Sequence, residues 1–97
     1  MERTLRAIAD PGRRQILSLV RDRERAAGEI AAQFDVSWPA ISQHLRVLRQ
    51  AGLVTERREG AKRFYRARPE GLREVRDYLD GFWDERLEQL KREVERG

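Results

Sequence analysis

The 97-residue sequence contains no cysteine and only one histidine, His44. Without cysteine, the chain can form neither disulfides nor thiolate metal sites. No apolar run approaches the roughly 18 residues of a membrane-spanning helix, and Met1 does not lead into a signal segment with a basic start and an apolar stretch. We therefore expect a cytoplasmic protein that has no disulfides and no contact with a membrane.

Chain length and charge limit the architecture. The 97 residues predict a single domain over residues 1–97, because a second core would leave each part too small to be stable. Charged residues make up 39% of the sequence, so the core is small and dimerisation would bury more apolar surface. Residues 1–68 carry 15 Lys and Arg against 8 Asp and Glu, a net charge of +7, whereas residues 69–97 carry 6 against 9, a net charge of −3. The basic part fits a polyanionic partner.

Apolar residues at helical spacing predict four helices in the first half of the chain, over residues 2–9, 11–23, 26–34 and 37–51. Asp10 and Pro11 are a typical N-cap and first position for the second helix. Either Ser37 or Trp38 caps the fourth helix, and Gly52 ends it. Only a few residues separate the third and fourth helices, which is the spacing of a helix-turn-helix.

The second half of the chain predicts a β-hairpin and a long helix. Residues 53–58 and 63–67 resemble two short strands joined by a turn that contains Gly60. A helix then begins at Pro69, and its apolar residues form one stripe along it: Leu72, Val75, Leu79, Phe82, Trp83, Leu87, Leu90 and Val94. The predicted fold is therefore mainly α with a small β-hairpin, a winged helix-turn-helix in the order α-α-α-α-β-β-α.

The fourth predicted helix has a polar face without acidic residues. Ile41, Leu45 and Leu48 share the face expected to point into the core. The opposite face and its flanks hold Pro39, Ser42, Gln43, Arg46, Val47 and Gln50. No Asp or Glu lies between Val36 and Thr55. Short donors and acceptors beside an arginine can read base edges in the major groove of DNA; the alternative is a face that is merely solvated.

The predicted hairpin is strongly basic. Against Glu59 alone, residues 57–68 carry six cations: Arg57, Arg58, Lys62, Arg63, Arg66 and Arg68. Beside a recognition helix, cations on a turn can reach the DNA backbone or the minor groove. Charge runs are usually only solvated, so the hairpin supports DNA binding only in combination with the fourth helix.

Several stretches of the sequence resemble a known family. Residues 9–17, 36–49 and 51–54, which read ADPGRRQIL, VSWPAISQHLRVLR and AGLV, resemble the ArsR-type winged-helix repressors. Residues 57–60 and the strand that contains Tyr65 match the wing of that family. The resemblance spans nearly the whole chain and implies a homodimer that binds double-stranded DNA at a two-fold symmetric operator. The residues that it places against DNA are Ser37, Trp38, Pro39, Ser42, Gln43 and Arg46 in the fourth helix and Arg58, Lys62 and Arg63 in the wing.

The resemblance also implies that the first and last helices form the dimer interface. The apolar residues of these helices are the expected contacts: Leu5, Ile8, Leu79, Phe82, Trp83, Leu87 and Leu90. Phe82 and Trp83 could instead line a ligand pocket, but both fit the apolar stripe, so a core or interface position is favoured. The nine carboxylates of the last helix alternate with arginines at spacings typical of surface ion pairs, and we expect them to be solvated.

The sequence departs from the metal-sensing members of this family. Those members have ligand clusters that contain Cys, or His with carboxylates, whereas tetrahedral zinc cannot be held by His44 alone. We expect no metal and no cofactor, and we expect His44 to be packed or close to a phosphate. Residues 82–91 resemble a metal-independent branch, similar to autorepressors that are encoded beside a partner protein which relieves repression.

Other classes of function fit less well. An enzyme is disfavoured because the sequence has no nucleophile–base pair, no glycine-rich phosphate loop and no ligand cluster. A winged helix that binds only proteins would be expected to lack the acid-free face and the basic wing. A small-molecule-responsive repressor stays open, because apolar clefts between subunits leave no mark in a sequence. The sequence therefore predicts a DNA-binding transcriptional regulator, with a repressor favoured over an activator, and it names neither the effector nor the operator sequence.

Overall fold

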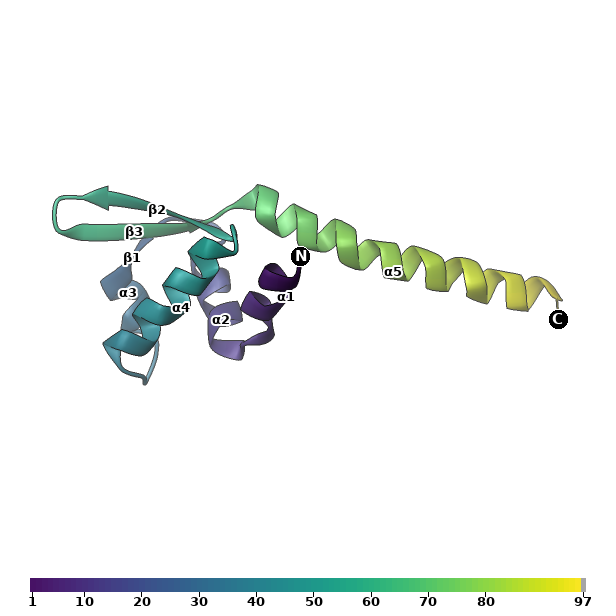
Figure 1. The fold of residues 1–97 in the computed structure, drawn as a ribbon, viewed down its shortest axis with the longest axis horizontal. Helices are drawn as coiled ribbons and strands as arrows, with labels where there is room; N and C mark the ends of the chain where they lie inside the picture. The colour runs from purple at the N-terminus through teal and green to yellow at the C-terminus, as the bar shows by residue number, and fades with distance from the viewer. Residues whose placement is uncertain (97) are drawn as a thin grey trace.

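The computed structural model describes residues 1–96, except for the side chains of Asp84 and Glu85. The predicted domain boundary at residue 97 lies outside the described residues. In chain order, the elements are α1 (Glu2–Ala9), α2 (Pro11–Val20), β1 (Arg25–Ala26), α3 (Ala27–Ala31), α4 (Trp38–Gln50), β2 (Val54–Glu59), β3 (Lys62–Ala67) and α5 (Pro69–Arg96). The first four helices gather beside the sheet, the tip of the β2–β3 hairpin lies at one end of the molecule, and α5 projects from the other end (Figure 1).

The corner between α1 and α2 is built by local hydrogen bonds. The carboxylate of Asp10 accepts from the backbone N–H of Arg13 at 3.0 Å, and Pro11 occupies the first turn of α2, as predicted. The side chains of Arg13 and Arg14 donate to carbonyls near the end of α1, among them that of Ala7 at 2.6 Å from Arg13 Nε. These carbonyls have no partner within their own helix, so the two arginines stabilise the end of α1.

Both ends of α4 follow local signals. Ser37, rather than Trp38, is the N-cap, because its hydroxyl accepts a backbone N–H of the first turn at 3.3 Å. At the other end Gly52 has a φ of 74°, and the N–H of Leu53 donates to the carbonyl of Leu48 at 3.0 Å. This is the Schellman arrangement, in which glycine adopts the left-handed conformation without a steric penalty.

Strand β1 was not predicted from the sequence. Arg25 pairs with Tyr65 and Ala26 pairs with Phe64, which adds a third antiparallel strand and gives the sheet order β1-β3-β2. A strand of two residues is too short to show an alternating pattern, so the sequence contains no signal for it. Its consequence is that the segment before α3 is fastened to the wing.

The two helices beside β1 have ends that differ from the predicted ones. The third helix was expected over residues 26–34, but Ala26 is extended and pairs with β3, so α3 spans only Ala27–Ala31 and turns follow it as far as Phe34. The second helix was expected to reach residue 23, but α2 ends at Val20. There the side chain of Arg25 donates to the carbonyl of Leu19 at 2.7 Å and stabilises the end of the helix.

The β2–β3 hairpin has its turn at Gly60, as predicted, and its strands are one residue longer at the turn than expected. Glu59 pairs with Lys62, so Gly60 and Ala61 form a two-residue loop. Gly60 has a φ of 61°, a conformation that glycine adopts readily and that suits short hairpin loops.

The buried core joins α2, α3, α4 and the residues that follow α4. Its largest fully buried side chains are Ile16, Val20, Ile30, Ile41, Leu48 and Leu53. Burying a side chain of this size stabilises the fold by about 1.5–3 kcal/mol. Val75 and Leu72 in the first turns of α5 pack against the same core. The predicted fold, a winged helix-turn-helix with a long last helix, is confirmed, with β1 as an addition. Within residues 1–96, no helix combines the length and the apolar composition that crossing a membrane requires.

Candidate nucleic-acid interface

Helix α4 has an exposed face without acidic side chains. Ile41, Leu45 and Leu48 are buried at helical spacing, as predicted. The exposed residues along the rest of the helix are Trp38, Pro39, Gln43, Arg46, Arg49 and Gln50. Trp38 stands out because it is a large aromatic residue that is 55% exposed. The face combines hydrogen-bonding groups with positive charge and has no carboxylate that would repel phosphate.

Cross-strand pairing places two cations of the wing on one face of the hairpin. Arg58 lies opposite Arg63, and Glu56 lies opposite Tyr65. Because alternate residues of a strand share a face, these four residues lie on the same side of the hairpin. Arg49 of α4 contacts Glu56 at 2.7 Å, so this is the side turned toward α4. Arg58 and Arg63 are therefore on the side of the wing that faces α4.

The carboxylate of Glu56 connects α4 to both strands of the wing. The side chain of Glu56 is only 11% exposed, and it accepts from Arg49 at 2.7 Å, from the Tyr65 hydroxyl at 3.4 Å and from Arg58 at 3.5 Å. Burial, together with the negative charge of Glu56, raises the pKa of Tyr65. Glu56 and Arg49 were not among the predicted site residues. We call Glu56 and its partners Arg49, Arg58 and Tyr65 the Glu56 hub. The one sequence signal for it is that Glu56 is the first acidic residue after the stretch without acidic residues.

Another cation of the hairpin is engaged away from α4. Arg57 contacts Glu24 at 2.6 Å and Glu59 at 3.0 Å, and its guanidinium lies 4.7 Å from the ring centroid of Phe64. The hydrogen bond from Arg57 lowers the pKa of Glu24. Arg57 thus fastens the wing to the segment after α2. By contrast, Lys62 has no ion pair among the side chains that the structure describes.

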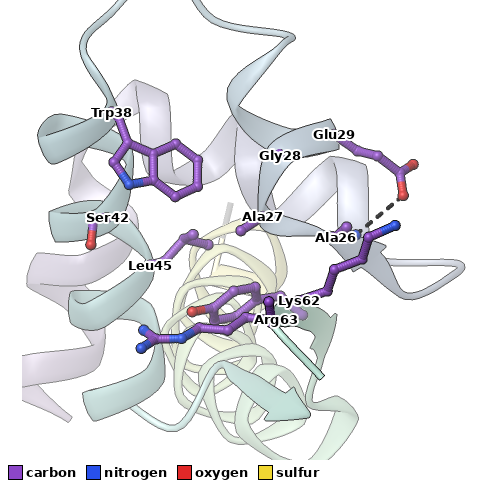
Figure 2. A pocket seen from close by; sticks show the side chains of 11 residues that line it. Ala26, Ala27, Gly28, Glu29, Trp38, Ser42, Leu45, Lys62 and Arg63 are labelled. Atoms are coloured by element: carbon purple, nitrogen blue, oxygen red, sulfur yellow. Dashed lines mark hydrogen bonds between the residues drawn. The ribbon is translucent and has the colours of Figure 1, made fainter. Parts of the chain in front are cut away.

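Some of the predicted DNA-contact residues meet at two depressions. A groove of about 80 Å³ between α4 and the hairpin is lined by Ser42, Arg46 and Arg63, together with the Glu56 hub. A larger cleft of about 600 Å³ lies between α3, α4 and the wing (Figure 2). Five of the nine predicted residues line one or both depressions: Trp38, Ser42, Arg46, Lys62 and Arg63. The other four are exposed and line neither of these two: Ser37, Pro39, Gln43 and Arg58.

His44 is packed against the start of α2. Its Nδ1 lies 3.3 Å from Nη1 of Arg13 and 4.0 Å from Oδ2 of Asp10. The pKa of Asp10 is lowered, chiefly by the hydrogen bond from the backbone N–H of Arg13 and also by His44 and the Arg13 guanidinium. These contacts give His44 a structural role, in which it joins α4 to the corner between α1 and α2.

The surroundings of His44 in the described structure hold a cation and one carboxylate. A cation, the Arg13 guanidinium, occupies the neighbourhood of His44. In the part of the chain that the structure describes, no three His, Cys, Asp or Glu side chains come together in a way that could hold a metal ion. Three or four such donors are needed for tetrahedral zinc.

Beyond Val75, helix α5 leaves the rest of the molecule (Figure 1). Phe82 is 57% exposed and Trp83 is 63% exposed. The other apolar residues of this part of the stripe are exposed as well: Leu79, Leu87, Leu90 and Val94. On α1, Leu5 is half-buried and Ile8 packs partly against the core. The predicted interface residues of α5 are therefore uncovered in a single chain, whereas on α1 Ile8 is shared with the core and Leu5 is half-buried.

Known proteins with similar sequences are transcription regulators. A family profile described as "Bacterial regulatory protein, arsR family" matches residues 10–56. The HTH-type transcriptional regulator Rv2034 of Mycobacterium tuberculosis is 43% identical over 86 residues, which cover 89% of this chain and 80% of that protein. The transcriptional repressor SdpR of Bacillus subtilis is 42% identical over 65 residues, which cover 67% of this chain and 72% of the repressor.

Solved structures agree with this result. The crystal structure of a possible transcriptional regulator for arsenical resistance is similar with a TM-score of 0.77 and 46% identity, covering 82% of this chain and 83% of that one. A solution structure of a homodimeric winged helix-turn-helix DNA-binding domain from Mycobacterium bovis has a TM-score of 0.69 and 33% identity, covering 87% and 78% of the two chains. The relatives are regulators and not enzymes, which confirms the prediction that this chain is not an enzyme. The chain belongs to the arsR family of bacterial regulatory proteins.

Proposed function

We propose that the protein is a transcriptional repressor that binds double-stranded DNA in a sequence-specific way, as a homodimer on a two-fold symmetric operator. The observation that carries the proposal is the acid-free, exposed face of α4, with Arg58 and Arg63 of the wing turned to the same side. An α-helix of this kind fits the major groove, where Gln43 and Arg46 would read base edges. The exposed N-terminal turn of α4 and the wing would contact the sugar-phosphate backbone.

The dimer is supported by the exposed stripe on α5. Large aromatic residues such as Phe82 and Trp83 are costly to leave in water and are enriched in protein interfaces. A second copy of α5 with Leu5 and Ile8 of α1 beside it would cover them. The similar winged helix-turn-helix domain from Mycobacterium bovis is described as homodimeric, which also supports the proposal. Two copies related by a dyad would read two half-sites on one face of the duplex.

We further propose that residues 1–97 act as one cytoplasmic domain that does not respond to metal ions. The absence of cysteine and the contact of His44 with Arg13 support this, because a sensor needs ligands that are free to gather around the ion. Repression would then be relieved by a protein or a small molecule rather than by a metal.

The salt dependence of DNA binding tests the central proposal. If a dimer neutralises about 6–10 phosphates, the logarithm of the association constant should fall with the logarithm of salt concentration at a slope of about −5 to −9. The assay is a titration of DNA from upstream of the protein's own coding sequence, with scrambled DNA of equal length as the control. A flat response to salt would favour a winged helix that binds proteins only.

A further inference from the structure

The cleft between α3, α4 and the wing has walls of different chemical character (Figure 2). Ala27 and Leu45 give it an apolar floor, and the indole of Trp38 lies along one side. Gly28 adds no side chain on the α3 side, where a Cβ atom would meet nothing within 4 Å. At about 600 Å³, the cleft is within the range of about 300–1,000 Å³ that is typical of small-molecule sites.

The charge of this cleft is positive. Glu29 is the acid in its lining, and its carboxylate accepts from the backbone N–H of Ala26 at 3.3 Å. Arg23 at 3.8 Å and Arg25 at 4.0 Å balance the charge of Glu29 from outside the cleft. Among the described side chains, Lys62 and Arg63 of the wing are therefore the charges of the lining without an ion pair, and they attract an anion.

Trp38 gives the cleft a flat surface for an aromatic ring. Trp38 is 55% exposed, so its indole is open to a ligand in the cleft (Figure 2). Ser42 and Tyr65 also line the cleft, and the Tyr65 hydroxyl donates to Glu56 at 3.4 Å. The guanidinium of Arg63 extends toward α4, whereas the side chain of Lys62 runs toward Glu29 on the α3 side (Figure 2). A flat apolar surface with the Arg63 guanidinium at one end suits a planar molecule with one negative end.

We propose that this cleft binds a small planar organic anion of the aromatic carboxylate class, and that bound anion and operator DNA exclude each other. The ring would stack on Trp38, and the carboxylate would point to the guanidinium of Arg63, with Lys62 adding positive charge at the far side of the cleft. The competition rests on the proposed function, because Trp38, Ser42, Lys62 and Arg63 are also the proposed DNA contacts. A carboxylate held among these side chains would pair with Arg63 of the wing and repel a DNA phosphate.

The test uses naphthoate as the probe and naphthamide as its uncharged counterpart. In heteronuclear NMR spectra of the full chain without DNA, naphthoate should move the indole N–H resonance of Trp38 and leave that of Trp83 in place. It should bind about tenfold more tightly than naphthamide, the effect of one charged hydrogen bond. Equal affinity for the two compounds, or a shift of Trp83 alone, would overturn the proposal.

Variants separate this cleft from general basic charge. In Lys62→Met combined with Arg63→Met, naphthoate affinity should fall about tenfold or more, towards that of naphthamide. Arg66→Met is the matched control, because Arg66 is an exposed cation of the same strand that does not line the cleft. The naphthoate affinity of this variant should equal that of the parent protein. Thermal melting of each variant establishes that it is folded. If the double variant is folded and binds naphthoate as the parent does, the anion site is not here.

A second titration measures the competition. Operator DNA should be displaced by naphthoate but not by naphthamide at equal concentration. If the chain binds naphthoate at Trp38 but binds no DNA, the proposed function fails and the cleft stands. If the chain binds operator DNA but not naphthoate, the cleft proposal fails and the proposed function stands.

Discussion

A Cβ atom on Gly71 would overlap the carbonyl oxygen of Gly52. Gly71 lies in the first turn of α5, and Gly52 is the residue at which α4 ends. The backbone of the last helix therefore rests directly on the backbone that follows α4. This contact sets the point from which α5 leaves the body of the protein, and with it the direction of the exposed apolar stripe.

Gly71→Ala should destabilise the protein, because either α5 or the loop at Gly52 must move to admit a methyl group. Overpacking of this kind costs about 1–3 kcal/mol. Gly81→Ala is the matched control in the same helix, since a Cβ atom there meets nothing within 4 Å. It should raise the free energy of unfolding by about 0.5–1 kcal/mol through helix propensity. Urea titrations at one protein concentration measure both, and equal effects would contradict the close contact.

The hydrogen bond from the Arg13 backbone to Asp10 should make stability depend on pH. The pKa of Asp10 is lowered in the folded state, chiefly by this hydrogen bond, from an ordinary value of 3.8. The stabilising contribution is therefore present above the ordinary pKa and is lost as the pH falls through the lower, folded-state pKa. Asp10→Ala should cost about 1 kcal/mol at neutral pH, as other N-cap losses do, and less in acid. Thermal melting of the parent and of Asp10→Ala from neutral to acid pH measures this difference in stability. If the difference does not become smaller in acid, the charge of Asp10 plays no part.

The recognition helix and the wing should affect DNA binding differently. Arg46→Ala and Gln43→Ala should reduce discrimination between operator and scrambled DNA by about 1–3 kcal/mol each, because base contacts carry the sequence information. Arg58→Ala and Lys62→Ala should weaken binding to both kinds of DNA by similar factors, because they contact the backbone. Competition titrations give both quantities. If the wing variants change specificity and the helix variants do not, the two roles are reversed.

The exposed stripe of α5 should hold the dimer together. Replacing Trp83 and Leu87 by glutamate should give a monomer, or an unfolded chain, that no longer binds the operator, since large aromatic residues dominate such interfaces. As a control, Glu88→Lys combined with Arg92→Glu changes two exposed charges of the same helix and should leave the dimer intact. Light scattering gives the molar mass of each. A double variant that stays dimeric would place the interface elsewhere, and a wild-type monomer at micromolar concentration would rule out the symmetric operator.

Metal ions should leave DNA affinity unchanged. The chain has no cysteine, its one histidine is packed against Arg13, and among the described residues no three His, Asp or Glu side chains come together to hold an ion such as zinc, cadmium or arsenite. Operator titrations with each ion, and with a chelator, measure the effect. A change of about tenfold or more, which corresponds to about 1.4 kcal/mol, would show that metal sensing occurs by another route.

Local signals made much of the fold predictable. The Asp10 cap, the Ser37 cap, the end of α4 at Gly52 and the turn at Gly60 each depend on residues within one or two turns of chain. The buried positions of α4 were predictable for the same reason, because helical periodicity is local. The exposed, acid-free face that makes α4 a candidate recognition helix follows from these buried positions, so it could be named from the sequence.

Contacts between distant residues were decided only by the tertiary structure. Strand β1 forms because residues 25–26 pair with β3, which lies about forty positions later in the sequence. Arg57 points away from the candidate DNA surface because it binds Glu24, which is 33 residues away in the sequence. In the same way, Glu56 joins Arg49 and Tyr65 into one hub, and Lys62 and Arg63 reach the cleft beside Trp38. The physical reason is that the sequence gives the charge and length of a side chain and indicates whether it is exposed. These properties show that the side chain can form an ion pair or a hydrogen bond. Which partner it meets depends on how the helices and the sheet pack against one another, and that is a property of the whole fold.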